Sequence, residues 1–337
     1  MNKETHDIRL DRLWQWLREV LGRAPERIEA LAGDASFRRY LRVHHGLRTF
    51  VAMDAPPQRE DCHPYVQVAA ALSAMGLSVP QILATDLAQG FLLLSDLGDE
   101  TYLAGLNEQT ADRLYGEAIS ALVRMQSQGT VAAETLPDYD HKLLLDEIRL
   151  FDTWYLDRHL QYELTARQRQ DLETVYAYLA EQALAQPRVF VHRDYHSRNL
   201  MILPLANPGI LDFQDAVHGP LTYDLVSLLR DCYIRWPAER VQGWIQDYYR
   251  QALQHELVQD LSLAEFERLF DCMGVQRHLK AIGIFARLQH RDGKSAYLGD
   301  IPRTLDYMRE VGPRYAPLLP LAELIAELPQ RTHACAS

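Results

Sequence analysis

The spacing of hydrophobic residues changes near residue 98, which divides the chain into two parts of different predicted structure. Before residue 98, short apolar runs bounded by Gly, Pro and charged residues predict strands. Two longer segments have the spacing of amphipathic helices, at 7–21 and 61–76. In the first of them the predicted buried positions are Ile8, Leu13, Trp14, Leu17 and Leu21. The predicted strands of this part are 40–43, 49–53, 78–86 and 90–100.

After residue 98 the helical period dominates. The predicted helices are 107–129, 141–160, 165–185, 221–234, 238–257, 263–288 and 302–311. The predicted strands of this part are 189–191, 200–203 and 209–213, and the first two are expected to form a β-hairpin. These patterns predict an α+β fold with two lobes. A small α/β N-lobe would cover 1–97, and a larger, mainly helical C-lobe would cover 98–337.

Composition excludes several classes of protein. The net charge of -11 and the pI of about 5.6 argue against nucleic acid as a partner, because binding to phosphate backbones needs a basic face. The N-terminus has no apolar signal segment, and no apolar run has the length of a membrane span. Cys62, Cys232, Cys272 and Cys335 form no CxxC pair, which is typical of reduced thiols. We therefore expect a cytoplasmic protein; the sequence gives no indication of its oligomeric state.

Polar residues gather in the segment "VHRDYHSRNLMI", between two apolar runs. Asp194 and Asn199 lie five residues apart, and Asp212 follows at the end of the next predicted strand. This set suits phosphoryl transfer. The reaction needs a carboxylate to orient the attacking hydroxyl and accept its proton, and oxygen ligands for Mg²⁺ on the phosphates. Asp194 fits the first role, and Asn199 with Asp212 fits the second.

Two other interpretations of this segment are an ordinary turn and a zinc-binding helix. A single Asp or Asn in a loop is usually a turn residue, but the ordered set HRDxxxxN followed by "DF" is much more specific. His192 and His196 have the i, i+4 spacing of a zinc-binding helix. Arg193, however, stands where such a helix needs its Glu, and the segment has the pattern of strand and loop. His192 and Arg193 are therefore predicted to hold the loop.

At these residues the sequence resembles the aminoglycoside phosphotransferase family, which has a protein-kinase-like fold. "VHRDYHSRNLMI" is similar to the family's catalytic loop, and "ILDFQDAVHGPLTYDLVSLL" to its metal-binding segment. The resemblance implies that Asp194 is the catalytic base and that Asn199 and Asp212 bind Mg²⁺. It also implies a structural role for Asp224. The family often has His two residues after the base, as at His196, which favours a small-molecule kinase over a protein kinase.

The resemblance extends over nearly the whole chain. "LAGDASFRRYLRV" is similar to the loop that covers the phosphates of ATP, where Gly33 allows close backbone approach. Ser36 and the neighbouring Phe37 and Arg38 are expected to contact phosphate oxygens. "FLLLSDLGD" is similar to the hinge, where backbone groups from Ser95 to Leu97 would bind adenine.

The third strand departs from the family pattern. It should carry a lysine that pairs with the ATP phosphates and with a helix Glu, but "TFVAMDAPP" has Met53 there. Arg38 or Arg39 is hypothesised to replace that charge, and Arg42 is also near in sequence. The alternative is that these are solvated strand residues. With Met53 at that position, Glu60, ahead of the helix, would have lost its usual partner, the lysine of the third strand.

The segments "GDASFRRY", "MDAPP", "LLLSDLGD" and "GVQRHLKAIGIFARLQHRDGKSAYLGDIPR" together resemble the anomeric sugar kinases of bacterial cell-wall recycling. That resemblance implies ATP-dependent phosphorylation of N-acetylmuramate and N-acetylglucosamine on the anomeric hydroxyl, so the expected partner is a small sugar.

N-acetylmuramate carries a carboxylate, so a cation near the sugar would be useful. The last of those segments contains a set of candidates: Arg277, His278, Lys280, Arg287, Arg291 and Lys294. The alternative is that these lie on a solvated helix face or pair with Asp292 and Asp300. The predicted substrate contacts are His196, Arg198 and Arg287.

Two alternatives to this function stay open. One is a kinase for another small hydroxyl compound, such as an aminoglycoside, a choline-like compound or an amino alcohol. The other is an inactive nucleotide-binding relative, which Met53 would explain.

Overall fold

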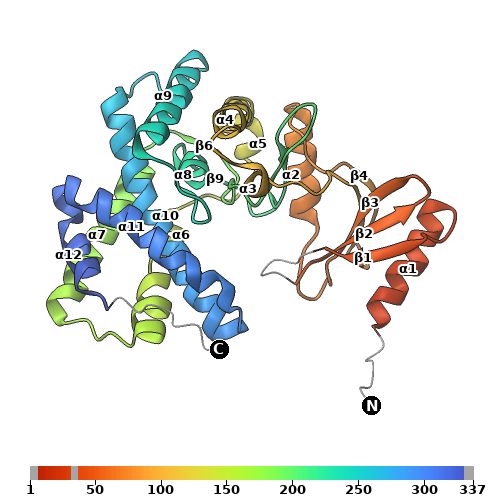
Figure 1. Cartoon of the computed structure of the whole chain (residues 1–337), viewed down its shortest axis with the longest axis horizontal. Coiled ribbons are helices and arrows are strands. Elements are labelled where there is room, and N and C mark those ends of the chain that lie inside the picture. Colours follow the sequence, from red (N-terminus) through yellow and green to blue (C-terminus); the bar gives the residue numbers. More distant parts are fainter. Residues whose placement is uncertain (1–6, 32–36, 330–337) are drawn as a thin grey trace. The chain divides into compact units, whose positions relative to one another are not determined.

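The computed structural model describes residues 7–31 and 37–329 of the chain. Two compact units are formed, and their elements are labelled in Figure 1. The N-terminal unit comprises 1–99 and 203–215, and the C-terminal unit comprises 100–202 and 216–337. Gly33 and Ser36 lie outside the described residues, so their predicted contacts with phosphate stay predictions.

The N-terminal unit is built on one antiparallel sheet with the strand order β1-β2-β3-β5-β4. Its strands are β1 (Arg27–Ala30), β2 (Arg39–His45), β3 (Arg48–Asp54), β4 (Ile82–Asp86) and β5 (Phe91–Ser95). Its helices are α1 (Ile8–Leu21) and α2 (His63–Ala74). The short strand β8 (Gly209–Ile210) also belongs to this unit. The predicted strand 209–213 is therefore too long, since only its first two residues are extended in a ladder.

Helix α1 covers one face of this sheet. Leu13, Trp16 and Leu17 pack against apolar side chains of β2, β3 and β5. The sequence predicted Ile8 and Trp14 on the buried face, which is wrong: Ile8 is 61% exposed, and Trp16 is the buried tryptophan.

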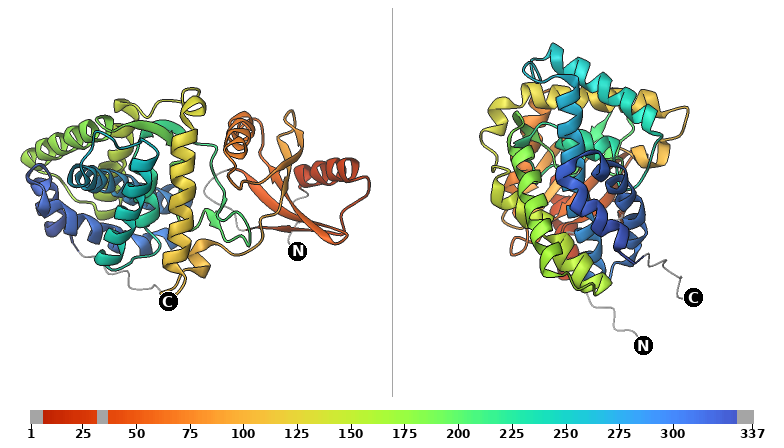
Figure 2. Two further views of the ribbon diagram at one scale, coloured as in Figure 1. Left: turned by 90° about the horizontal axis from the view of Figure 1, so that it is seen from above. Right: turned by 90° about the vertical axis from the view of Figure 1, so that its left-hand side faces the viewer.

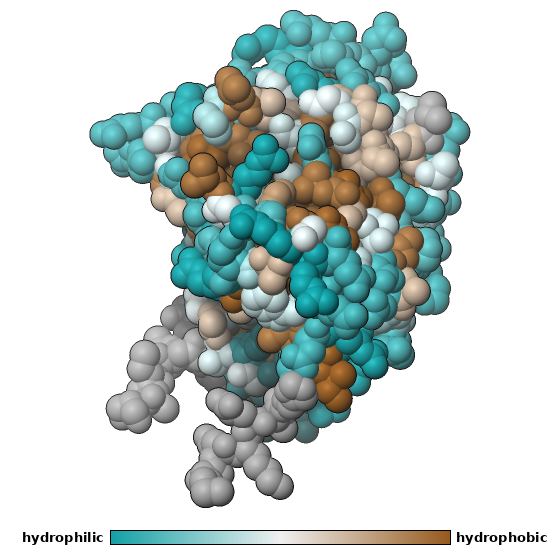
Figure 3. Space-filling view, turned by 90° about the vertical axis from the view of Figure 1, so that its right-hand side faces the viewer, coloured by the Kyte–Doolittle hydropathy of each residue, from teal (hydrophilic) through white to brown (hydrophobic). Residues whose placement is uncertain are grey.

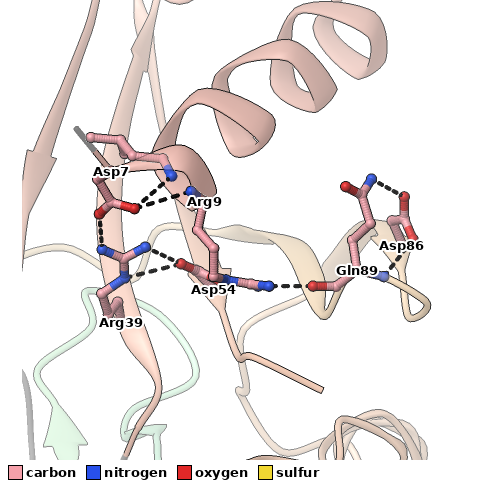
Figure 4. A network of polar contacts seen from close by, with 7 residues as sticks. Asp7, Arg9, Arg39, Asp54, Asp86 and Gln89 are labelled. Carbon is pink, nitrogen blue, oxygen red and sulfur yellow. Dashed lines mark hydrogen bonds and ion pairs between the residues drawn. The ribbon is translucent and has the colours of Figure 1, made fainter. Parts of the chain in front are cut away.

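The first turn of α1 is fixed to the sheet by a polar network (Figure 4). Asp7 caps the helix, because its carboxylate accepts from the backbone N–H groups of Arg9 and Leu10 at 3.1 Å. The buried Asp54 carboxylate accepts from the guanidinium groups of Arg9 and Arg39, and Arg39 also pairs with Asp7. Removal of one member of such a buried network typically costs about 3–5 kcal/mol.

The C-terminal unit is mainly helical and packs around α10, a helix of 30 residues. A capping box of Ser262 and Glu265 starts α10, and Gly293 in the left-handed conformation ends it. Figure 2 shows the helices around it, and α10 contacts α6, α7, α8, α11 and η1. The helices are α3 (Tyr102–Gly105), α4 (Ala111–Gln128), α5 (Thr130–Ala133), α6 (His141–Ile148), α7 (Ala166–Leu184), α8 (Tyr223–Leu229), α9 (Ala238–Gln254), α10 (Leu263–Asp292), α11 (Ile301–Val311) and α12 (Leu319–Glu327).

Short irregular helices complete this unit. They are η1 (Phe151–Leu160), η2 (Ser295–Asp300), η3 (Gly312–Arg314) and η4 (Ala316–Leu318). The predicted single helix 141–160 is in fact α6 followed by η1, a π-helix that ends where Gln161 takes a φ of 54°. A period of 3.6 residues and the wider π turn give similar apolar spacing over one or two turns, so the pattern did not separate them.

The strands of the C-terminal unit correct another prediction. They are β6 (Arg188–Val191), β7 (Leu200–Met201) and β9 (Val217–Pro220), and β6 pairs antiparallel with β9. The two apolar runs around Asp194 therefore do not form a hairpin with each other. The loop that connects them is held by hydrogen bonds to Asp224 and Asp231.

Figure 3 shows one face of the molecule, on which hydrophilic side chains predominate and hydrophobic side chains form patches. No helix in the described part of the chain combines the length and hydropathy that crossing a membrane requires.

Candidate active site

The loop that follows β6 is held by hydrogen bonds to Asp224, at the start of α8. The fully buried carboxylate of Asp224 accepts hydrogen bonds from the backbone N–H groups of His192, at 2.6 Å, and Arg193, at 2.9 Å. Burial raises the pKa of Asp224 to about 7, and these two hydrogen bonds act in the opposite direction. Arg193 has a φ of 77°, a conformation that non-glycine residues seldom adopt. The structural role expected of Asp224 is thus seen in its hydrogen bonds.

Beyond Asp224, the same loop is held by Asp231, a residue that sequence reasoning missed. One carboxylate oxygen of Asp231 accepts from the backbone N–H of Ser197, at 3.0 Å, and from the Ser197 hydroxyl. The other accepts from the backbone N–H of Tyr233 at 2.9 Å. His192 also has a structural role, because its Nδ1 accepts from the backbone N–H of Asp194 at 3.2 Å.

Among the described residues, no group of three or more His, Cys, Asp or Glu side chains could hold a metal ion.

A buried ionic cluster lies beside the loop. Glu147 of α6, which is 7% exposed, pairs with Arg193 and with Lys280 of α10, whose Nζ is 2.9 Å from Glu147 Oε1. The Tyr139 hydroxyl donates to Glu147, and Lys280 also donates to the Tyr223 hydroxyl at 2.9 Å. Burial acts to raise the pKa of Glu147, but Lys280 and Arg193 outweigh it, so the pKa is lowered. The cluster therefore has two cations and one carboxylate.

Asp194 lies next to this excess of positive charge. Burial acts to raise the pKa of Asp194, but the charges of Lys280, His196, Arg277 and Arg193 outweigh it, and the pKa is lowered. The described residues donate no hydrogen bond to its carboxylate. Its backbone carbonyl accepts from the His196 N–H at 3.0 Å and from the Asn199 side-chain amide at 3.1 Å. Asp194 is thus an ionised carboxylate with a fixed backbone and oxygens available to a hydroxyl group.

The two predicted metal ligands lie in different units, and each has chemistry that fits Mg²⁺. Asn199, in the C-terminal unit, uses its amide nitrogen to bind the Asp194 carbonyl, and its other side-chain atom is an oxygen of the type that Mg²⁺ prefers. Asp212, in the N-terminal unit, has a φ of 60°, and its carboxylate accepts from Gln214 Nε2 at 2.8 Å. Strained backbone at a non-glycine residue is common at functional sites.

In the N-terminal unit, Met53 is fully buried in β3, opposite Tyr40 of β2 and Leu92 of β5. The described residues do show a cation beside Glu60, the glutamate ahead of α2. Arg38 Nη2 lies 2.9 Å from Glu60 Oε2, and the two side chains are only 9% and 14% exposed. Glu60 thus lacks the usual lysine of the third strand, as expected, and pairs with Arg38 in its place.

Glu60 has a second contact with the loop, because its Oε1 accepts from the Phe37 backbone N–H at 3.1 Å. The Phe37 ring is 58% exposed, and the Arg59 guanidinium lies 4.5 Å from its centroid. Glu60 thus anchors the end of the predicted phosphate loop at two consecutive residues.

Two other arginines near β3 bind carboxylates other than Glu60. Arg39 is bound to Asp54 and Asp7 in the network of Figure 4. Arg42 is bound to Asp96, Asp99 and the Gly98 carbonyl. These contacts favour Arg38 over Arg39 in the hypothesis that one of them replaces the lysine, which stays a hypothesis.

The predicted hinge contains Ser95, at the end of β5, and Leu97, which follows it. The backbone N–H of Ser95 donates to the Gln81 carbonyl at 2.9 Å, and the Ser95 hydroxyl accepts from the Gln81 N–H at 2.8 Å. The Ser95 N–H is therefore engaged within the sheet edge, and the contact of adenine with the other backbone groups from Ser95 to Leu97 stays a prediction. Leu97, which follows β5, stays a prediction.

The predicted substrate residues His196 and Arg198 both contact Tyr233. His196 is buried and packs edge-on against the Tyr233 ring at 5.3 Å, and the Arg198 guanidinium lies 3.7 Å from that ring's centroid. Arg287, in contrast, is half-buried on α10, its Nε has no partner among the described residues, and burial lowers its pKa.

The other candidate cations of α10 have different environments. The alternative of a solvated helix face is wrong for Arg277, His278 and Lys280, which are all buried. Burial lowers the pKa of His278 to about 3, so His278 is neutral. Arg291 fits the alternative, because it is exposed and pairs with Asp292 at 2.8 Å.

Comparison with protein families identifies the class. The model of the phosphotransferase enzyme family matches residues 27–261, which cover more than half of the chain. This region includes the Arg38–Glu60 pair, Asp194, Asn199 and Asp212. The chain therefore belongs to the phosphotransferase enzyme family.

The relatives of known name narrow this class. A protein of Pseudomonas putida named N-acetylmuramate/N-acetylglucosamine kinase is 47% identical over 333 residues, covering 96% of this chain and 97% of its own. A protein of the same name from Pseudomonas aeruginosa is 49% identical over 310 residues, with 92% and 91% covered. One from Neisseria meningitidis serogroup B is 42% identical over 322 residues, with 94% and 95% covered.

Solved structures support the kinase-like fold. The gentamicin complex of an aminoglycoside phosphotransferase, APH(2")-IIa, is similar with a TM-score of 0.61 at 13% identity, covering 89% of this chain and 96% of that one. The choline kinase LicA of Streptococcus pneumoniae has a TM-score of 0.58 at 12% identity, with 88% and 98% covered. The predicted α+β, protein-kinase-like fold with a small sheet-containing part and a larger helical part is confirmed.

Proposed function

We propose that the protein is a cytoplasmic sugar kinase that transfers the γ-phosphoryl group of ATP to the anomeric hydroxyl of N-acetylmuramate and N-acetylglucosamine. The products are the sugar 1-phosphate and ADP, and the reaction would serve the recycling of peptidoglycan. The observation that carries this proposal is the identity of 42–49% with three curated kinases of that name over at least nine-tenths of each chain.

The chemistry of Asp194 supports the proposal. In the transfer, the anomeric oxygen forms a bond to the γ-phosphorus, the bond to the ADP oxygen breaks, and Asp194 accepts the hydroxyl proton. Anomeric hydroxyls are more acidic than ordinary alcohols, so a carboxylate with a lowered pKa is a sufficient base. Positioning of the hydroxyl and neutralisation of charge would supply most of the rate enhancement.

Nucleotide and metal contacts are part of the same proposal. The Phe37 and Arg38 end of the phosphate loop, anchored by Glu60, would hold phosphate oxygens, and Gly33 and Ser36 would approach them from the preceding residues. Leu97 would contact adenine through its backbone. Asn199 and Asp212 would hold Mg²⁺, which would neutralise charge on the phosphates when bound. His196, Arg198 and Arg287 would contact the sugar.

Kinases for aminoglycosides or choline are the second candidate function, because solved structures of both kinds share this fold. Those similarities are at 12–13% identity and support the fold alone. The inactive alternative is disfavoured by the presence of Asp194, Asn199, Asp212 and the Arg38–Glu60 pair.

A substrate panel tests the proposal. ADP release from Mg-ATP would be measured with N-acetylmuramate, N-acetylglucosamine, a set of aminoglycosides and choline. The proposal predicts turnover with the two sugars and none above background with the other compounds. Turnover of an aminoglycoside or of choline without turnover of either sugar would overturn it, as would ATP binding with no turnover at all.

A further inference from the structure

Arg277 of α10 is a buried cation with little to bind inside the protein. Arg277 is only 6% exposed. Its Nη1 donates to the sulfur of Cys232 at 3.8 Å, and its Nε has no partner among the described residues. Sulfur is a weak acceptor, so the guanidinium keeps most of its hydrogen-bonding capacity unused.

Other buried cations near Arg277 have carboxylate partners. Lys280, one turn further along α10, binds Glu147, and Arg230 at the end of α8 binds Asp271. Arg277 forms no such ion pair within the described part of the chain, and Asp194 and Asp231 act on it only at longer range. A buried charge without a close partner is costly. The unused donors of Arg277 therefore indicate that an anion from outside the chain completes its environment.

Arg277 lies beside a support of the loop that contains Asp194. Its Nη1 contacts the sulfur of Cys232 at 3.8 Å. The neighbouring Asp231 accepts from the backbone N–H of Ser197, three residues after Asp194, at 3.0 Å. Cys232, the contact residue of Arg277, follows Asp231 directly. An anion bound by Arg277 would consequently lie near the carboxylate that is proposed to receive the sugar hydroxyl.

We infer that Arg277 binds the carboxylate of an anionic acceptor sugar, and this inference rests on the proposed function. Under that function the anion is the lactyl carboxylate of N-acetylmuramate. This group is on C3 of the ring whose C1 hydroxyl is phosphorylated, so both groups are held in one site. The planar guanidinium matches a carboxylate with two parallel hydrogen bonds. N-acetylglucosamine has an uncharged hydroxyl at C3 and gains much less from Arg277.

Other cations of the C-terminal unit fit this role less well. Arg198 is exposed, and its guanidinium stacks on Tyr233. Arg291 is exposed and paired with Asp292. Arg287 has an unpaired Nε, but it is only half-buried. Of these four, Arg277 combines full burial with spare donors and a contact to the residue next to Asp231.

The test compares both sugars in variants of one helix. R277M removes the charge at similar volume, R277K keeps the charge without the planar fork, and R291M removes an exposed charge from the same helix as a control. We would measure kcat and KM for N-acetylmuramate and for N-acetylglucosamine with saturating Mg-ATP, and the thermal midpoint of each variant.

R277M is expected to lower kcat/KM for N-acetylmuramate by about 10- to 100-fold, the usual effect of losing hydrogen bonds between charged groups. Its kcat/KM for N-acetylglucosamine should change less than about threefold. R277K should retain part of the preference, and R291M should match the wild type. The thermal midpoint of R277M should be unchanged or higher, because a poorly paired buried charge is removed.

Three results would overturn the inference. Equal losses for the two sugars in R277M and R277K would assign Arg277 to the transferred phosphoryl group or to the loop. Unchanged kinetics for both sugars would leave the cation with no role in binding. A wild type that phosphorylates neither sugar would refute the proposed function itself, and that failure is distinct from an unselective effect of the variants.

Discussion

At the scale of residues, the environment of Asp194 sets the pH range in which the protein should work. Lys280 is the cation that lowers the pKa of Asp194 most, against the effect of burial. Because only the carboxylate can accept a proton, activity should fall as the pH drops through that lowered pKa. The acid limb of the pH profile should therefore lie below the usual range of an aspartate.

Substitution of Lys280 tests this electrostatic role. K280M removes a positive charge near Asp194, so the pKa of Asp194 should rise and the acid limb of kcat/KM should move to higher pH. K142M, which removes an exposed lysine of α6, is the matched control and should leave the profile unchanged. An acid limb at the same pH in K280M and in the wild type would contradict the role that we give to Lys280.

A second residue-scale prediction concerns Arg38, which we propose replaces the missing lysine of β3. R38M should raise the KM for ATP by about 10- to 100-fold, because a charged partner of the phosphates is lost, and R38K should recover part of that loss. The affinity can also be measured directly by titration calorimetry with ATP and Mg²⁺. R48M, at an exposed position of β3, is the control; equal KM values in R38M and R48M would exclude Arg38 from nucleotide binding.

Sequence reasoning identified the residues of the loop and its support by Asp224, but it did not find the more distant supports. Asp194, Asn199 and Asp212 follow an ordered local motif, which can be recognised without a structure. Glu147, Asp231 and Lys280 are far from that loop in sequence, and a single charged residue on a helix is typical of a solvated face. Their roles depend on which helices pack against the loop, and one sequence does not specify that packing.

At the scale of elements, the local patterns predicted most helices, including α10, and the error in the strands came from distant pairing. The β6–β9 ladder joins segments that are separated in sequence. Val217–Pro220 was missed as a strand because it contains Gly and Pro, which are unfavourable in strands. Pairing with β6 outweighs that local preference.

The contact between α10 and η1 depends on one glycine. A Cβ on Gly283 would lie 2.4 Å from the carbonyl carbon of Leu150 and 2.6 Å from its oxygen. G283A should therefore reduce the free energy of unfolding by about 1–3 kcal/mol and lower the thermal midpoint, because backbone must move to make room.

A glycine on another helix provides the control for this prediction. Gly243 of α9 is exposed, and a Cβ there would meet nothing within 4 Å. G243A should be neutral or stabilise by up to about 1 kcal/mol, through the better helix propensity of alanine. If thermal unfolding showed the same midpoint for G283A and G243A, the close approach of α10 and η1 would not limit stability.

At the scale of the whole molecule, the residues with proposed roles in phosphoryl transfer are distributed over both units. The N-terminal unit contains the Arg38–Glu60 pair and Asp212, and the C-terminal unit contains Asp194, Asn199 and Arg277. Composition, period and motif were enough to predict a small sheet-containing part and a larger helical part. The choice of sugar came from resemblance and is supported by the named relatives, because spacing of residues alone does not encode substrate specificity.

The most direct test of the central claim is the position of phosphate in the product. Purified protein would be incubated with Mg-ATP and N-acetylmuramate, and the product analysed by ³¹P NMR, with D194N as the control. The account predicts a phosphate coupled to the anomeric proton, formed by the wild type and nearly absent with D194N. Phosphate on another oxygen of the sugar, or undiminished product with D194N, would contradict it.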